Sequence, residues 1–254
     1  MKILAITQAR IGSTRFPAKI LKMIHGESLL EIHLRRILES KLITKLKVAT
    51  TIEPEACKIV EISNKLNVEV YQGSVNNVLD RFYQTALPEA PNWIVRLTSD
   101  CPLIDFIEID RVIHFAIAND LDYASNTLKP TFPDGIDVEV FKFSALEKAF
   151  KEARLTSEIE HVTPYIWKNS TYKKNNLFKS DCVINDVDYS SVRLTVDTLE
   201  DFMVIEKLIE LIGTDKRWID YVKLLQSNPD IQKINEHFTR NEGYKKSILN
   251  DRIA

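Results

Sequence analysis

An apolar run, Ile3-Leu-Ala-Ile6, leads directly into the polar and basic stretch Gln8-Ala-Arg-Ile-Gly-Ser-Thr-Arg-Phe-Pro-Ala-Lys19. The apolar run has the length and composition of a strand that is buried on both faces of a parallel sheet. Ligands of such sheets bind at the carboxyl ends of the strands. We therefore expect a central strand over residues 2–6 and a ligand-binding loop directly after it.

The same alternation continues along the chain. Further short apolar runs predict strands at 46–50, 68–71 and 93–97. Between and after them, amphipathic patterns predict four helices. The first starts at the capping box Ser28–Glu31 and has an apolar face that extends to Leu42. The other three are expected from Pro54 to about residue 66, over 78–86 and over 109–117. Four strands alternating with four helices are typical of a mostly parallel α/β sheet that is sandwiched by helices.

The second half of the chain is less regular. Its patterns predict strands at 122–125 and 137–141 and helices at 144–153, 158–168 and 199–212. Residues 170–196 are polar with short β-like pieces, which we interpret as a small β arm and a candidate dimer contact. From Lys216 the chain is expected to be helical and to fray after Gly243. No segment resembles a linker, so we expect one domain over 1–254.

The composition excludes several classes of protein. The 254 residues include 34 Lys+Arg and 36 Asp+Glu, and 44% are hydrophobic, which indicates a folded rather than a disordered chain. No stretch approaches the roughly 20 apolar residues of a membrane helix, and the N-terminal apolar run is too short for a secretory signal. Three scattered cysteines fit reduced thiols. We therefore expect a cytoplasmic protein that does not contact a membrane.

Positive charge is concentrated near the N-terminus, where residues 1–50 hold ten Lys/Arg and three Asp/Glu. In a mildly acidic protein this favours a local anion site over a broad nucleic-acid surface. The loop after the first strand offers a flexible glycine, two hydroxyls and three cations: Arg10, Gly12, Ser13, Thr14, Arg15 and Lys19. Such groups bind phosphates, although the loop is neither a Walker P-loop nor a dinucleotide loop. A merely polar surface loop is the alternative.

Two carboxylates are candidate metal ligands. Asp100 follows the strand predicted at 93–97, and Asp197 ends a short strand-like run. A carboxylate at the carboxyl edge of a sheet commonly holds Mg²⁺, which bridges triphosphate oxygens. The alternative is helix capping, a role that fits Asp105 and that either Asp197 or Thr198 could fill.

A third acidic group lies in Pro133-Asp134-Gly135-Ile-Asp137-Val-Glu139-Val-Phe141, a turn that leads into an alternating strand. Asp137 and Glu139 would share one face of that strand, where they could accept hydrogen bonds from sugar hydroxyls or simply face solvent. His161 has polar neighbours at helical spacing. A structural, hydrogen-bonded histidine is the alternative to a role in the site.

These motifs occur in a recognisable order, together with Gly73-Ser74…Asp80-Arg81, Glu160-His-Val-Thr-Pro-Tyr165 and Val196-Asp-Thr-x-Glu-Asp201. Over residues 3 to about 205 the chain resembles the SpsF family, named for a spore-coat polysaccharide biosynthesis protein. That family is similar to the CMP-Kdo and CMP-sialic acid synthetases, which are cytidylyltransferases. The resemblance implies a Rossmann-like, GT-A-like nucleotidyltransferase fold and the transfer of CMP from CTP to an acidic sugar.

The resemblance also assigns roles to residues, with CTP, an acidic sugar and Mg²⁺ as ligands and a homodimer as the assembly. Catalysis would fall to Arg15, Lys19 and Asp100, and Mg²⁺ to Asp100 and Asp197. The acceptor would contact Asp134, Asp137, Glu139, Glu160 and His161. The nucleotide would contact Gln8, Ala9, Arg10, Gly12, Ser13, Arg15, Lys19, Gly73, Asp80, Arg81, Thr98 and Asp100.

Departures from the family pattern concern mainly the acceptor. Asn76-Asn77 stands where acidic residues are usual, Ile159 stands where an arginine is common, and Phe16 and Ala18 replace Leu and Gly. Two other functions stay open. One is a glycosyltransferase that uses Asp186-Val-Asp188 as a D-x-D metal motif, and the other is a non-catalytic binding protein with the same fold.

Overall fold

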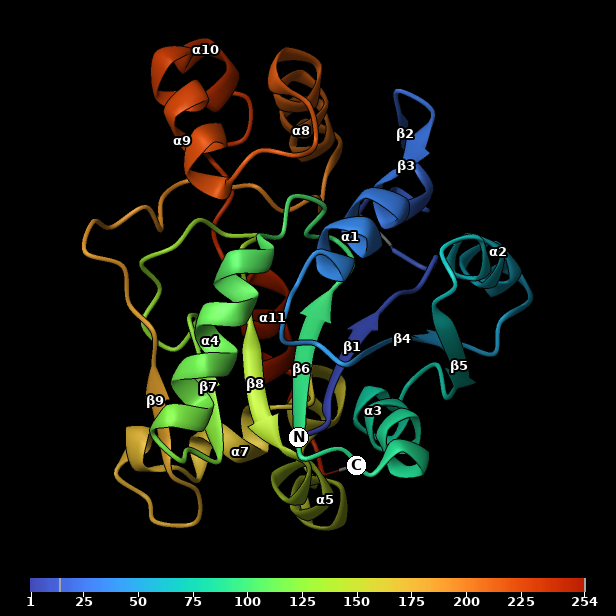
Figure 1. Ribbon diagram of the computed structural model, residues 1–254, viewed down its shortest axis with the longest axis vertical. Helices are drawn as coiled ribbons and strands as arrows, with labels where there is room; N and C mark the ends of the chain where they lie inside the picture. The colour runs from blue at the N-terminus through green and yellow to red at the C-terminus, as the bar shows by residue number, and fades with distance from the viewer. Residues whose placement is uncertain (14, 254) are drawn as a thin grey trace.

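The computed structural model describes residues 1–13 and 15–253. Its centre is a seven-stranded sheet in the order β5-β4-β1-β6-β8-β7-β9 (Figure 1). All strands except β8 run in the same direction, which confirms the mostly parallel sheet. The strands are β1 Ile3–Gln8, β4 Lys45–Thr51, β5 Glu69–Gly73, β6 Trp93–Thr98, β7 Tyr123–Ser125, β8 Glu139–Lys142 and β9 Ser180–Cys182.

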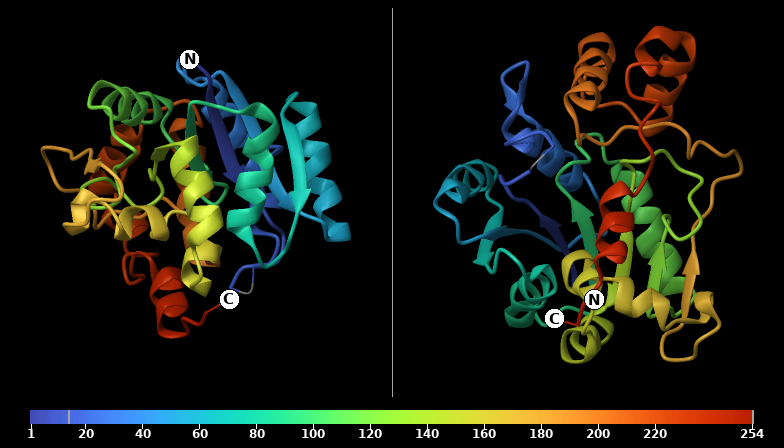
Figure 2. Two further views of the ribbon diagram at one scale, coloured as in Figure 1. Left: turned by 90° about the horizontal axis from the view of Figure 1, so that it is seen from below. Right: turned by 180° about the vertical axis from the view of Figure 1, so that it is seen from behind.

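Helices cover both faces of this sheet, as the view from below shows (Figure 2, left). They are α1 Leu29–Leu38, α2 Cys57–Lys65, α3 Val78–Ala86, α4 Phe106–Ala118, α5 Phe143–Glu152, α6 Thr156–His161, α7 Pro164–Lys168, α8 Leu199–Ile212, α9 Trp218–Ser227, α10 Pro229–Gln232 and α11 Glu242–Leu249. Short 3-10 turns and a small hairpin complete the fold: η1 Lys19–Leu21, η2 Pro54–Ala56, η3 Leu87–Glu89, η4 Thr171–Lys173, β2 Met23–Ile24 and β3 Glu27–Ser28.

The central strand β1 contributes side chains to two separate apolar cores, one on each face of the sheet. Ile3 and Ala5 belong to the core that α1, α2, α4 and α8 build on one face. Leu4 and Ile6 belong to the core that α3 and α5 build on the other face. Alternate side chains of a strand point to opposite faces, so a fully apolar run is what a strand buried on both sides requires.

Capping residues start the helices where the sequence predicts. Ser28 Oγ accepts a hydrogen bond from the Glu31 amide at 3.2 Å, and Glu31 accepts one from the Ser28 amide at 3.0 Å, so the predicted capping box is confirmed. Asp105 caps α4 by accepting from the Ile107 amide at 2.9 Å. Thr198, rather than Asp197, caps α8.

Three predicted segments differ from the structure. Helix α1 ends at Leu38, because Asp110 accepts hydrogen bonds from the amides of Lys41 and Leu42 and holds them in a turn, so Leu42 is exposed instead of inward. The helix expected over 158–168 is two helices, broken at Val162, whose φ is +71°. Residues 170–196 supply one short strand, β9, which pairs with β7 at the edge of the main sheet.

The end of the chain also departs from expectation. Instead of fraying after Gly243, it forms α11, which lies across the middle of the molecule when seen from behind (Figure 2, right). Within residues 1–13 and 15–253 no helix combines the length and the apolar character needed to cross a bilayer. Cys57, Cys101 and Cys182 are free thiols, as predicted.

Candidate active site

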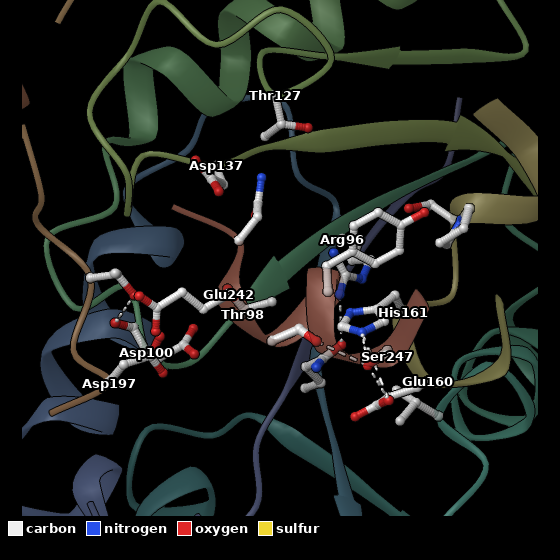
Figure 3. A pocket seen from close by; sticks show the side chains of 18 of the residues that line it. Arg96, Thr98, Asp100, Thr127, Asp137, Glu160, His161, Asp197, Glu242 and Ser247 are labelled. Carbon is white, nitrogen blue, oxygen red and sulfur yellow. Dashed lines mark hydrogen bonds and ion pairs between the residues drawn. The ribbon is translucent and has the colours of Figure 1, made fainter. Parts of the chain in front are cut away.

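A cleft of about 920 Å³ opens at the carboxyl edge of the sheet. The loops after β1 and β6 form one end of it, the helices α6 and α7 form the other, the segment before β8 also lines it, and residues 239–250 close one side. Figure 3 shows these two ends, with Asp100 and Asp197 at one and Glu160, His161 and Ser247 at the other. The cleft has the size of a site for a nucleotide and a second small molecule.

Most of the predicted site residues line this single cleft. They are Gln8, Ala9, Arg10, Ser13, Arg15, Lys19, Arg81, Thr98, Asp100, Asp134, Asp137, Glu139, Glu160, His161 and Asp197. Gly12, Gly73 and Asp80 do not line it. Gly73 leaves room for a residue that does line the cleft, because a Cβ at position 73 would lie only 2.9 Å from Cγ of Arg81. Thr14 lies outside the described residues.

Lys19 joins the two predicted metal ligands. Its ammonium lies 3.0 Å from Oδ2 of Asp100 and 2.7 Å from Oδ1 of Asp197. Burial alone would lower the pKa of Lys19, but the attraction of both carboxylates raises it above its ordinary value. Burial would likewise raise the pKa of Asp100, but the charge of Lys19 holds it well below its usual range. Both groups are therefore ionised at neutral pH.

Two arginines hold Asp197 in place. Arg15 approaches Oδ2 of Asp197 at 2.8 Å and Glu242 at 3.3 Å. Arg193 lies 3.3 Å from Asp197 and makes a tighter pair with Asp201 at 2.8 Å. Arg15 and Lys19 are thus already paired with carboxylates of this chain, and a bound anion would have to replace those partners.

Two further acidic groups that line the cleft, one buried and one half-buried, are each paired with an arginine. Glu139 is 7% exposed, forms an ion pair with Arg96 and accepts hydrogen bonds from Tyr123 Oη at 2.6 Å and Thr163 Oγ1 at 2.5 Å. Asp137 is paired with Arg240. Glu139 is therefore fixed inside the site, and Asp137 is held at the cleft by its arginine partner.

His161 is tied to the C-terminal helix. Its Nε2 lies 3.0 Å from Oγ of Ser247, which also donates to Glu160 at 2.7 Å. Burial and the positive charge of Arg96 lower the pKa of His161 to about 4, so the imidazole is neutral at pH 7. His161 is therefore hydrogen-bonded, as a structural histidine would be, and it also lines the cleft, so a role in binding the acceptor stays a prediction.

Several residues of the site escaped the sequence analysis. Arg96, Thr163, Tyr244 and Ser247 all line the cleft. Beneath it, the fully buried His33 connects Thr7 Oγ1 at 2.8 Å with the carbonyl oxygen of Cys101 at 2.8 Å, next to Asp100. The one available signal was Arg96, a charge inside an apolar strand, since a buried arginine needs a carboxylate partner.

The donor set at Asp100 and Asp197 fits Mg²⁺. In the part of the chain that the structure describes, no cluster of three or more His, Cys, Asp or Glu side chains could hold a metal. Mg²⁺ is usually bound by one or two carboxylates together with substrate phosphates and water, so two adjacent carboxylates meet that need. Asp186 and Asp188 do not line the cleft, which removes the D-x-D motif from this site.

The chain is similar to known proteins over most of its length. A family model described as "Cytidylyltransferase" matches residues 4–240. The spore coat polysaccharide biosynthesis protein SpsF of Bacillus subtilis is 33% identical over 90% of this chain and 95% of its own length. A cytidylyltransferase structure from Leptospira borgpetersenii has 35% identity and a TM-score of 0.86, and the match covers 94% of this chain and 98% of that one.

The similarity to Kdo enzymes is more limited in extent. The 3-deoxy-manno-octulosonate cytidylyltransferase of Geotalea daltonii is 33% identical over 129 residues, which are 51% of this chain and 50% of that protein. The predicted resemblance to both groups of proteins is thereby confirmed.

Proposed function

Because the chain belongs to the cytidylyltransferase family, we propose that it transfers CMP from CTP to a sugar acid and releases pyrophosphate. One observation carries the proposal. Lys19 joins Asp100 and Asp197 at the carboxyl edge of the sheet, so cations for phosphate oxygens and carboxylates for a metal meet at one point. This combination is suited to phosphoryl transfer, in which positioning and charge neutralisation do most of the work.

The proposed reaction is an in-line displacement at the α-phosphorus of CTP. An acceptor hydroxyl gives up its proton to solvent and forms a bond to phosphorus, while the bond between phosphorus and the bridging oxygen breaks and pyrophosphate leaves with that electron pair. Arg15 and Lys19 would hold the leaving pyrophosphate and offset its growing charge. Asp100 and Asp197 would hold Mg²⁺, which when bound supplies further positive charge at the phosphate oxygens.

The acceptor is proposed from two lines of support. The similar protein from Geotalea daltonii is a 3-deoxy-manno-octulosonate cytidylyltransferase, and the name of SpsF refers to polysaccharide biosynthesis. In this chain, the cleft is also lined by carboxylates at Asp137 and Glu139, which their arginine partners hold in place. Such groups accept hydrogen bonds from sugar hydroxyls. A polysaccharide precursor with several hydroxyls and one carboxylate fits this description.

Thermal unfolding with CTP, UTP, ATP and GTP, each with and without Mg²⁺, tests the nucleotide part of the proposal. A ligand that binds only the folded state raises the midpoint in proportion to its affinity and concentration. We expect CTP with Mg²⁺ to give the largest rise. A rise with nucleoside diphosphates or nucleotide sugars, and none with any triphosphate, would favour a glycosyltransferase instead.

A further inference from the structure

The C-terminal segment Thr239–Ile253 forms one side of the cleft, although the family model ends at residue 240. From this segment, Glu242, Gly243, Tyr244, Lys246, Ser247 and Asn250 line the cleft. Figure 2 (right) shows α11 in front of the sheet, beside β6 and β8. The part of the chain that the family model matches therefore supplies only part of the walls of this site.

The segment is anchored at both ends. At its start, Arg240 is paired with Asp137. At its end, Asp251 accepts hydrogen bonds from the amide and the hydroxyl of Ser157 at 2.9 and 2.8 Å, and the Thr156 amide donates to the carbonyl of Arg252 at 2.9 Å. These contacts fix α11 against the start of α6. Helix α11 is therefore held in place as one wall of the cleft.

Side chains of α11 continue an aromatic and polar surface that begins on α6 and α7. The ring of Tyr244 meets His161 edge-on with centroids 5.0 Å apart, and it meets Trp167 at 6.1 Å. Ser247 bonds to both His161 and Glu160. Glu242, in the first turn of α11, forms a solvent-exposed ion pair with Arg15 at the phosphate end. Most of α11 therefore faces the end of the cleft remote from Lys19.

Two donors in this part of the cleft lack partners. Among the residues that the structure describes, the hydroxyl of Tyr244 and Nε of Arg96 are buried and make no hydrogen bond, and both side chains line the cleft. A buried polar group without a partner is costly, so such groups are normally satisfied by a ligand or by water. Two unsatisfied donors beside an aromatic surface indicate a ligand that is rich in oxygen atoms.

We propose that α11 forms the acceptor subsite, in which Tyr244 Oη and Arg96 Nε donate hydrogen bonds to oxygen atoms of the sugar acid. This inference rests on the proposed function, because it names where the acceptor of that reaction binds. The neutral His161 and the aromatic faces of Tyr244 and Trp167 border the sugar on this side. With α11 in place, the cleft has a volume of about 920 Å³, which suffices for a nucleotide and a sugar. Because both donors are buried in this structure, the side chains of Tyr244 and Arg96 must turn toward the cleft when the sugar binds.

The test compares Tyr244→Phe and Ser247→Ala with Lys245→Ala, a matched control on the same helix that does not line the cleft. Pyrophosphate release is measured with CTP, Mg²⁺ and either 3-deoxy-manno-octulosonate or N-acetylneuraminate as the acceptor. We expect Tyr244→Phe to raise the KM of the acceptor about tenfold, the effect of one lost hydrogen bond to a charged oxygen. The KM of CTP should stay within about twofold, and Lys245→Ala should resemble the wild type.

Each result decides between the inference and the proposed function. If the wild type turns over and Tyr244→Phe and Ser247→Ala leave the acceptor KM unchanged, or change the KM of CTP equally, the subsite is wrong and the reaction stands. If CTP stabilises the protein but neither acid supports turnover nor protects residues 242–249 from hydrogen exchange, the subsite and the acceptor class both fail. If CTP does not stabilise the protein, the proposed function itself fails.

Discussion

The ammonium of Lys19 lies 2.7 Å from Oδ1 of Asp197, although 178 positions separate the two residues in the sequence. Together with Asp100 at 3.0 Å, this places one cation between two carboxylates. A triphosphate and a divalent cation, entering together, could exchange these pairs without leaving any charge unpaired, since phosphate would take Lys19 and the metal would take the carboxylates. The site is therefore suited to bind nucleotide and metal jointly.

Replacing Lys19 with alanine should lower turnover strongly. The change removes a positive charge that faces the leaving pyrophosphate, and loss of one such group typically costs a factor of about 10²–10³ in kcat. Pyrophosphate release gives the rate, and circular dichroism shows whether the fold is kept. Lys22→Ala is the control, because Lys22 is an exposed neighbour that does not line the cleft. Turnover like that of the wild type in a folded Lys19→Ala protein would contradict this role.

Replacing Asp197 with asparagine should weaken the response to Mg²⁺. Asparagine keeps the shape of the side chain but loses the charge, which makes it a much poorer ligand for a hard cation. Titrating Mg²⁺ at fixed CTP should show a half-saturating concentration at least about tenfold above that of the wild type. Asp188→Asn is the control, since Asp188 is exposed and outside the cleft. A larger effect of Asp188→Asn than of Asp197→Asn would support the D-x-D motif instead.

Buried His33 should make the protein less stable in mild acid. The Cys101 carbonyl can only accept, so Nδ1 of His33 carries the proton and Nε2 accepts from Thr7. Burial lowers the pKa of His33 to about 4, against about 6.5 in an unfolded chain. The unfolded state therefore takes up a proton between these values, and the free energy of unfolding should fall by up to about 3 kcal/mol as the pH drops from 6.5 to 4.

Urea unfolding at several pH values between 4 and 7 measures this effect. In His33→Gln, which can still donate to the Cys101 carbonyl, the free energy of unfolding should depend less on pH than in the wild type. His161 contributes in the same direction, because its pKa is also lowered to about 4, so some dependence should persist. His114→Gln, on an exposed position of α4, should behave like the wild type. An identical pH slope in His33→Gln and the wild type would refute the argument.

Local sequence patterns predicted the first half of the fold because the signals there are local. The apolar run of β1, the capping box at Ser28 and the cap at Asp105 each depend on residues within a few positions of one another. The same is true of the loop cations Arg15 and Lys19, whose place after a central strand puts them at the carboxyl edge. The position of Arg15 and Lys19 directly after this strand was therefore enough to predict that they lie at the cleft.

Long-range contacts explain what the sequence did not predict. Helix α11 has a weak apolar pattern, with Ile248 and Leu249 exposed, and it is held by contacts such as that of Asp251 with Ser157, 94 positions away. The meeting of Asp100 and Asp197 at Lys19 likewise depends on the closed fold. The pairing of Arg96 with Glu139 follows from the neighbouring strands β6 and β8, and no local pattern specifies that register.

Phosphorus NMR of the wild-type protein with CTP, Mg²⁺ and the two sugar acids tests the central claim most directly. Attack at the α-phosphorus predicts that CTP is replaced by equal amounts of pyrophosphate and a CMP phosphodiester, and that neither forms without the acceptor. CDP and inorganic phosphate as the products, or pyrophosphate released without any CMP phosphodiester, would contradict the assignment of this cleft to cytidylyl transfer.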